Sequence, residues 1–201
     1  MKTIKNFMIS ILIGLTVGVI TVIGQKYLPI NLNFLANSGA IWLIPTYLLS
    51  YYLKQDKLSS ILVSIICLIS CVLGYYLFES ILNNHSFFIS MYMIIWLVCA
   101  LIGGTIFGLG AYYSNNKENI LNQFSQNLLP AVLFSEGVNK LIHLNNYNHM
   151  IPAVITVTIL GILLYLIINR KNIVKGKNII TFVILSVLGI LFYEIIYIIC
   201  S

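Results

Sequence analysis

Charged residues are scarce in this chain of 201 residues, which has only 11 Lys and Arg and 5 Asp and Glu residues. Charged residues make up 8% of the sequence, whereas hydrophobic residues make up 60%. A soluble protein of this length needs far more charge on its surface. No polar stretch is long enough to fold separately, so the composition predicts a single membrane-embedded domain over residues 1–201.

The sequence patterns of familiar catalytic and metal sites are also missing. The chain has no HExxH, no Gly-x-Ser-x-Gly and no Ser-His-Asp order, and it lacks the paired Glu of intramembrane prenyl-protein proteases. Its four cysteines lie in apolar segments and show neither zinc-type nor disulfide-type spacing. We therefore expect a non-enzymatic protein with no catalytic residue, no metal ligand and no cofactor.

Long apolar segments fill most of the chain. A membrane-spanning helix needs about 20 apolar residues, with a range of roughly 17 to 25. Seven segments reach or approach this length, at residues 7–23, 39–53, 58–78, 87–113, 128–144, 151–168 and 179–199. The fifth is the least apolar, because Glu136, Asn139, Lys140 and His143 lie in its second half. We predict an all-α integral membrane protein with a bundle of about seven transmembrane helices, with six as the alternative.

The few cations are unevenly distributed between these segments. Nine of the eleven lie before the first segment or in alternate gaps: Lys2, Lys5, Lys54, Lys57, Lys117, Arg170, Lys171, Lys175 and Lys177. Cytoplasmic loops of membrane proteins carry an excess of Lys and Arg. This distribution predicts seven crossings, a cytoplasmic N-terminus and a multi-pass protein of the bacterial cytoplasmic membrane. Cations in such loops orient helices and contact the lipid bilayer, so the net charge of +6 does not indicate nucleic-acid binding.

Pairs of glycines four residues apart occur in two of the segments. Gly14 and Gly18 lie in the first, and Gly104 and Gly108 lie in the fourth. This spacing lets two helices approach closely within a membrane. The partner helix belongs either to the same chain, which we favour, or to a second copy or another subunit of a membrane complex.

Polar residues gather near the predicted extracytoplasmic side, among them all three histidines. At 100° per residue, Glu136, Lys140 and His143 form one stripe on the fifth segment. The i,i+4 spacing of Glu136 and Lys140 favours an ion pair. A charge at this depth costs about 3 kcal/mol unless it is paired or faces water. Two interpretations stay open: a structural ion pair, and an outward-facing polar pocket that binds or transports a solute.

The candidate ligand-binding residues of that pocket are Asn37, Ser38, Trp42, Glu136, Lys140, His143 and Glu194. A membrane-embedded enzyme with Glu136 and His143 as an acid/base pair is the alternative function. A metal site built from Glu79, His85 and His143 is a further, weaker alternative, because their spacing is not diagnostic. Tyrosines near the helix ends are interpreted as an interfacial aromatic belt: Tyr51, Tyr52, Tyr75, Tyr76, Tyr112, Tyr113, Tyr193 and Tyr197.

Several short strings, taken together in their order and spacing, resemble a known family. They are 35–42 (LANSGAIW), 74–76 (GYY), Trp96, 103–104 (GG), 107–110 (FGLG) and 134–137 (FSEG). Together they resemble domain of unknown function 6518, a family of small bacterial membrane proteins. The resemblance implies a multi-helix membrane fold and no established activity. It directs attention to Asn37, Ser38, Trp42 and Glu136, which match the pattern.

Overall fold

The computed structural model describes residues 2–53, 56–115, 121–170 and 176–200, and every regular element within these residues is helical. The elements are α1 (Lys2–Tyr27), α2 (Asn33–Ala36), α3 (Gly39–Leu53), α4 (Lys57–Leu82), α5 (Met91–Asn115), α6 (Leu121–Ile142), α7 (Leu144–Tyr147), the 3-10 helix η1 (Asn148–Met150), α8 (Ile151–Ile168) and α9 (Gly176–Cys200). Each of the seven predicted segments overlaps one long helix, and the segments 39–53 and 151–168 match α3 and α8 to the residue. The all-α prediction is confirmed.

Within the described residues, five stretches are long and apolar enough to cross a membrane: Ile4–Tyr27 of α1, all of α4 and α5, Gly176–Ile199 of α9, and Leu144–Ile168, which ends in α8. The chain is thus a multi-pass membrane protein by the length and composition of its helices. The other two long helices differ from these for separate reasons. With 15 residues, α3 is only about 22 Å long, whereas the hydrocarbon core is about 30 Å thick. With 22 residues, α6 is long enough but contains Glu136, Asn139 and Lys140.

These two less typical helices lie where other helices shield them. The helix α3 contacts α1, α4, α5 and α6, and α6 contacts α3, α5, α8 and α9. Ten of the 22 residues of α6 are buried, including Glu136 and Asn139. Polar side chains within membrane proteins face the bundle interior for this reason, because lipid offers them no hydrogen bonds.

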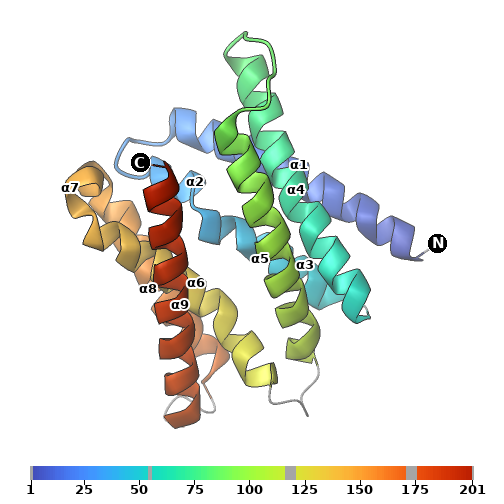
Figure 1. Ribbon diagram of the computed structural model, residues 1–201, viewed down its shortest axis with the longest axis vertical. Helices are drawn as coiled ribbons and strands as arrows, with labels where there is room; N and C mark the ends of the chain where they lie inside the picture. Colours follow the sequence, from blue (N-terminus) through green and yellow to red (C-terminus); the bar gives the residue numbers. More distant parts are fainter. Residues whose placement is uncertain (1, 54–55, 116–120, 171–175, 201) are drawn as a thin grey trace.

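The long helices run between two ends of the molecule, and α1 crosses the others obliquely (Figure 1). The end of α4, the start of α5, the short helix α7 and the end of α9 lie toward the top of Figure 1. The end of α5 and the starts of α6 and α9 lie toward the bottom. The polar residues at the end of α6 therefore share one end of the bundle with Glu194 of α9.

The glycine pair of α1 lies directly against the backbone of α4. A Cβ atom added to Gly14 would be 2.3 Å from the carbonyl oxygen of Cys67, and one added to Gly18 would be 2.4 Å from that of Cys71. Real Cβ atoms do not approach backbone atoms this closely. Only glycine at these two positions permits the observed distance between α1 and α4.

The glycine pair of α5 also lies directly against the backbone of α4, but it contacts other residues of that helix. A Cβ atom added to Gly104 or Gly108 would lie 2.7 Å from the Cα atom of Ile65 or Ile61, respectively. Both glycine pairs are therefore buried against a helix of the same chain, and α4 lies between two helices that present glycine to it.

Candidate functional site

The carboxylate of Glu136 is buried, with only 3% of the residue exposed, and lies at the start of α3. It accepts hydrogen bonds from the Ser38 hydroxyl, from the Gly39 N–H at 3.0 Å and from the Ala40 N–H at 3.2 Å. The Ser38 hydroxyl oxygen accepts in turn from the Ile41 N–H at 3.1 Å. The first N–H groups of a helix have no partner within that helix, and its N-terminus attracts negative charge. Glu136 therefore supplies from α6 the cap that α3 needs.

The predicted ion pair between Glu136 and Lys140 is wrong. The Lys140 ammonium group donates a hydrogen bond to the Tyr147 hydroxyl at 2.8 Å and lies 4.0 Å from the centre of that ring. Within the described residues, the ion pairs shorter than 4.0 Å join histidines to Glu79 and Glu194, not Lys140 to Glu136. Donors from α3 already occupy the carboxylate of Glu136, while Lys140 extends toward the end of the bundle.

A second polar network fastens α9 to the end of α6. The Glu194 carboxylate accepts a hydrogen bond from the Asn139 amide at 2.8 Å, and the same oxygen lies 2.8 Å from Nε2 of His143. The His143 ring stacks on Tyr197 with 3.8 Å between the ring centres. The Tyr197 hydroxyl accepts from the Asn146 amide at 2.6 Å. The carboxylate and the imidazole thus satisfy each other.

The structure distributes the seven candidate residues over separate places. Ser38 contacts Glu136, His143 contacts Glu194, and Lys140 contacts Tyr147, as described above. The exposed Asn37 ends α2, where its backbone N–H bonds to the carbonyl of Phe34. Trp42 is buried and donates its indole N–H to the Thr21 hydroxyl at 2.9 Å. The hydrogen bonds of these residues thus belong to separate groups.

The contacts of the histidines bear on the two chemical alternatives, the acid/base pair and the metal site. Glu136 and His143 belong to different hydrogen-bond networks: Glu136 is bonded to Ser38, and His143 to Glu194. His85 lies 3.8 Å from Glu79, while His143 is engaged with Glu194. Across the described ranges, no three His, Cys, Asp or Glu side chains gather as a metal ion would require.

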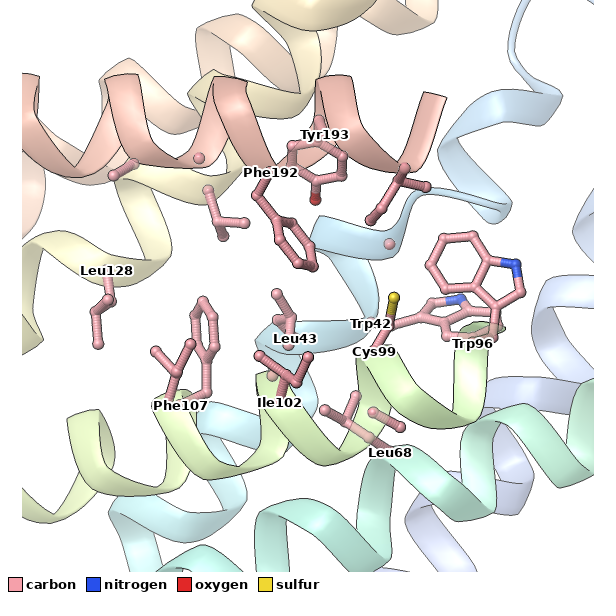
Figure 2. A pocket seen from close by; sticks show the side chains of 18 of the residues that line it. Trp42, Leu43, Leu68, Trp96, Cys99, Ile102, Phe107, Leu128, Phe192 and Tyr193 are labelled. Carbon is pink, nitrogen blue, oxygen red and sulfur yellow. The ribbon is translucent and has the colours of Figure 1, made fainter. Parts of the chain in front are cut away.

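An apolar cavity of about 360 Å³ lies between α3, α5, α6 and α9, and Leu68 and Val72 of α4 also contribute to its wall (Figure 2). It is lined by 21 residues, none of which is charged. Glu136 is not among them, but it is close, because a Cβ atom added to the lining residue Gly39 would be 3.8 Å from its Oε1 atom. The same Cβ atom would be 3.5 Å from the ring of Trp96. The capping carboxylate thus lies beside the apolar space, and it acts electrostatically on Tyr193, which lines that space.

Aromatic rings form one part of the cavity wall. Trp42 and Trp96, the two tryptophans of the chain, both line the cavity, with 6.1 Å between their ring centres. The ring centre of Tyr75 also lies 6.1 Å from that of Trp42. Of the seven candidate residues, Trp42 alone lines this cavity.

Tyr193 lines the cavity, which corrects the prediction that it belongs to the interfacial belt. It is only 8% exposed and lines the cavity from α9. The signal that identifies it is the spacing of the lining residues Leu185, Gly189, Tyr193 and Ile196. Residues three or four apart share one face of a helix. The sequence therefore indicates that these residues share a face of α9, but it does not indicate which helices that face contacts.

Comparison with known protein families identifies a match over nearly the whole chain. Residues 1–198 match the family model described as "Family of unknown function (DUF6518)". Neither the curated proteins nor the solved structures contain a match. The match spans almost the whole chain, including both polar networks and the cavity.

Proposed function

The chain belongs to the family of unknown function DUF6518, and we propose that it is a non-enzymatic membrane protein that binds a small apolar or amphipathic ligand in the cavity between α3, α5, α6 and α9. The observation that carries this proposal is the cavity itself. Ligand sites are concave, mostly apolar and about 300–1,000 Å³ in volume. This cavity falls in that range, and its wall includes both tryptophans and Tyr193.

In this proposal the ligand binds in the apolar cavity and not at the polar residues Glu136 and Glu194. Glu136 caps α3 and Glu194 holds Asn139 and His143, so these carboxylates already have partners. Their role in the proposal is to hold α3 and α9 in position as two walls of the cavity. An acid/base reaction between Glu136 and His143 finds no support in these contacts.

We further propose that all seven long helices cross the cytoplasmic membrane of a bacterium, with the N-terminus in the cytoplasm. The alternation of cation-rich and cation-poor gaps supports this orientation. The shielding of α3 and α6 supports their inclusion, because an interior helix does not need a fully apolar surface. In this arrangement α5 and α9 face lipid on their outer sides.

The rim of the cavity then indicates the route of entry. The lining residues Ile102 and Ile106 of α5 and Leu188 of α9 are exposed, Leu188 by 57%. Apolar side chains at an open rim would face acyl chains rather than water. A ligand would therefore enter sideways from the bilayer, between α5 and α9.

Tryptophan fluorescence provides a direct test, because both tryptophans line the cavity. The purified protein in lipid nanodiscs is titrated with 1-bromododecane, whose bromine quenches indole fluorescence on contact. We expect saturable quenching, which indicates a finite site. Val132→Phe adds volume to the α6 wall and should weaken this quenching several-fold, whereas the matched change Val98→Phe, on an exposed part of α5 outside the lining, should not.

Quenching that rises without saturation, with the same slope in wild type and in Val132→Phe, would mean that the bromoalkane acts only from the surrounding lipid. That result would overturn the proposed binding function. It would leave a structural or accessory role for the protein in the membrane.

A further inference from the structure

The hydroxyl group of Tyr193 is a buried polar group inside an otherwise apolar space. Only 8% of the residue is exposed, and it lines the cavity. In Figure 2 its hydroxyl points away from α9 and toward the light-blue ribbon of α3. Over the ranges that the structure describes, no hydrogen bond holds this hydroxyl, although the Glu136 carboxylate acts on it electrostatically, whereas the Tyr197 hydroxyl one turn later accepts a hydrogen bond from Asn146.

A buried hydroxyl without a partner is costly. Moving a hydroxyl from water into an apolar site without a compensating hydrogen bond is unfavourable by about 1–3 kcal/mol in proteins. A phenylalanine at this position would fill the same space without that cost. The hydroxyl is therefore best explained by a partner that enters the cavity.

The walls of the cavity define what that partner can be. None of the lining residues is charged, so a charged head group would be buried without a counter-ion. The remaining surface is almost entirely hydrocarbon and aromatic, which suits an apolar chain. A bound water needs two to four polar contacts, whereas a chain with one oxygen needs only one and fills the apolar remainder of the cavity.

We propose that the ligand is a neutral lipid with an apolar chain and one oxygen-bearing head group, a hydroxyl or a carbonyl, that hydrogen-bonds to Tyr193. This inference rests on the proposed function and specifies its ligand. The phenol both donates and accepts, so it can bond either kind of oxygen. The chain of the ligand lies along the cavity toward the exposed rim, and its head lies at Tyr193.

Competition for the cavity tests this specificity. Nanodiscs that hold the protein with 1-bromododecane are titrated with 1-dodecanol, 2-dodecanone or dodecane, each at a measured mole fraction in the bilayer, and the recovery of tryptophan fluorescence is followed. A neutral hydrogen bond contributes a factor of roughly 2- to 10-fold in affinity. We expect dodecanol, dodecanone or both to displace the bromoalkane at a lower mole fraction than dodecane requires, and the two mole fractions should differ by this factor. The alcohol and ketone arms tell the two head groups apart.

Tyr193→Phe should abolish the difference between the oxygen-bearing chains and dodecane while leaving displacement by dodecane unchanged. Tyr197→Phe is the matched control, because it removes a tyrosine hydroxyl from the same helix outside the cavity, and it should keep the difference. Equal displacement by all three chains in the wild type would overturn the proposal, as would a preference that survives Tyr193→Phe. The wild-type comparison decides the matter even if Tyr193→Phe fails to fold.

The two proposals fail in different ways. Loss of saturable quenching by 1-bromododecane contradicts ligand binding in the cavity as a whole. Saturable quenching with no advantage for an oxygen-bearing chain leaves the binding function intact and contradicts only the role of Tyr193.

Discussion

Ser38 and Glu136 are 98 positions apart in the sequence, and the hydroxyl of one donates a hydrogen bond to the carboxylate of the other. The same carboxylate accepts the first N–H groups of α3. A helix that begins inside a bundle cannot satisfy these groups with water, so it needs a partner from the protein. The contact thus explains why an acidic residue is buried in α6.

Replacement of Glu136 by Gln should destabilise the protein. The amide keeps one acceptor but turns an N–H₂ group toward N–H donors of α3, which leaves buried groups unpaired at a cost of roughly 1–3 kcal/mol. Ser38→Ala removes the cap of Ile41 and should cost about 1 kcal/mol. Melting curves in detergent measure both effects, and a Glu136→Gln protein as stable as wild type would contradict the capping role.

The combination of Glu136→Gln with Lys140→Met distinguishes a cap from an ion pair. Lys140 bonds to Tyr147 rather than to Glu136, so removal of its charge should recover little of the stability that Glu136→Gln loses and should also cost the Tyr147 contact. The double variant should therefore be less stable than Glu136→Gln alone. Recovery of stability in the double variant would instead indicate that Lys140 and Glu136 compensate each other.

Replacement of Gly18 by Ala should separate α1 from α4. The new methyl group would need space that the carbonyl oxygen of Cys71 occupies at 2.4 Å, and overpacking of this kind costs typically about 1–3 kcal/mol. Gly103→Ala is the matched control, because there the methyl group would meet the Leu43 and Leu68 side chains at an ordinary 3.6 Å. Thermal melting should show a loss for Gly18→Ala and no loss for Gly103→Ala.

Single-cysteine labelling tests the proposed orientation. In a background without the native cysteines, we expect a membrane-impermeant maleimide added to intact cells to label His85→Cys, which follows α4, and not Gly176→Cys, at the start of α9. Both positions should react after the membrane is permeabilised. Labelling at position 176 from outside intact cells would contradict seven crossings with a cytoplasmic N-terminus.

The stability contribution of Asp56 should depend on pH. Asp56 precedes α4 and its pKa lies below the ordinary value of 3.8, because the Ser59 hydroxyl and then the Ser59 N–H bond to its carboxylate. A lowered pKa in the folded state means that the stabilisation is complete above the unfolded pKa and is lost as the pH falls through the folded pKa. Asp56→Ala should therefore lower the melting temperature at pH 7, and the difference from wild type should shrink at pH 3. A difference that stays constant with pH would contradict this.

The sequence was a good guide to the helices and a poor guide to their contacts. The segments 39–53 and 151–168 were predictable to the residue because asparagines and short polar stretches interrupt the apolar runs there. The partner of Glu136 was not predictable in the same way. Spacing along one helix brings Lys140 near Glu136, but the donors of α3 come from a distant segment, and periodicity does not say which helices face each other. Tyr193 was misplaced for the same reason, since nearness to a helix end does not reveal burial.

The packing of α4 has a consequence for how this family can diverge. Where two side chains touch, an enlargement on one helix can be offset by a smaller residue on the other. At Gly14 and Gly18 the opposing atoms are the carbonyl oxygens of Cys67 and Cys71, which are present whatever residues occupy those positions. No substitution in α4 can make room there, so relatives that keep this helix spacing should retain glycine at both positions while the side chains at positions 67 and 71 vary.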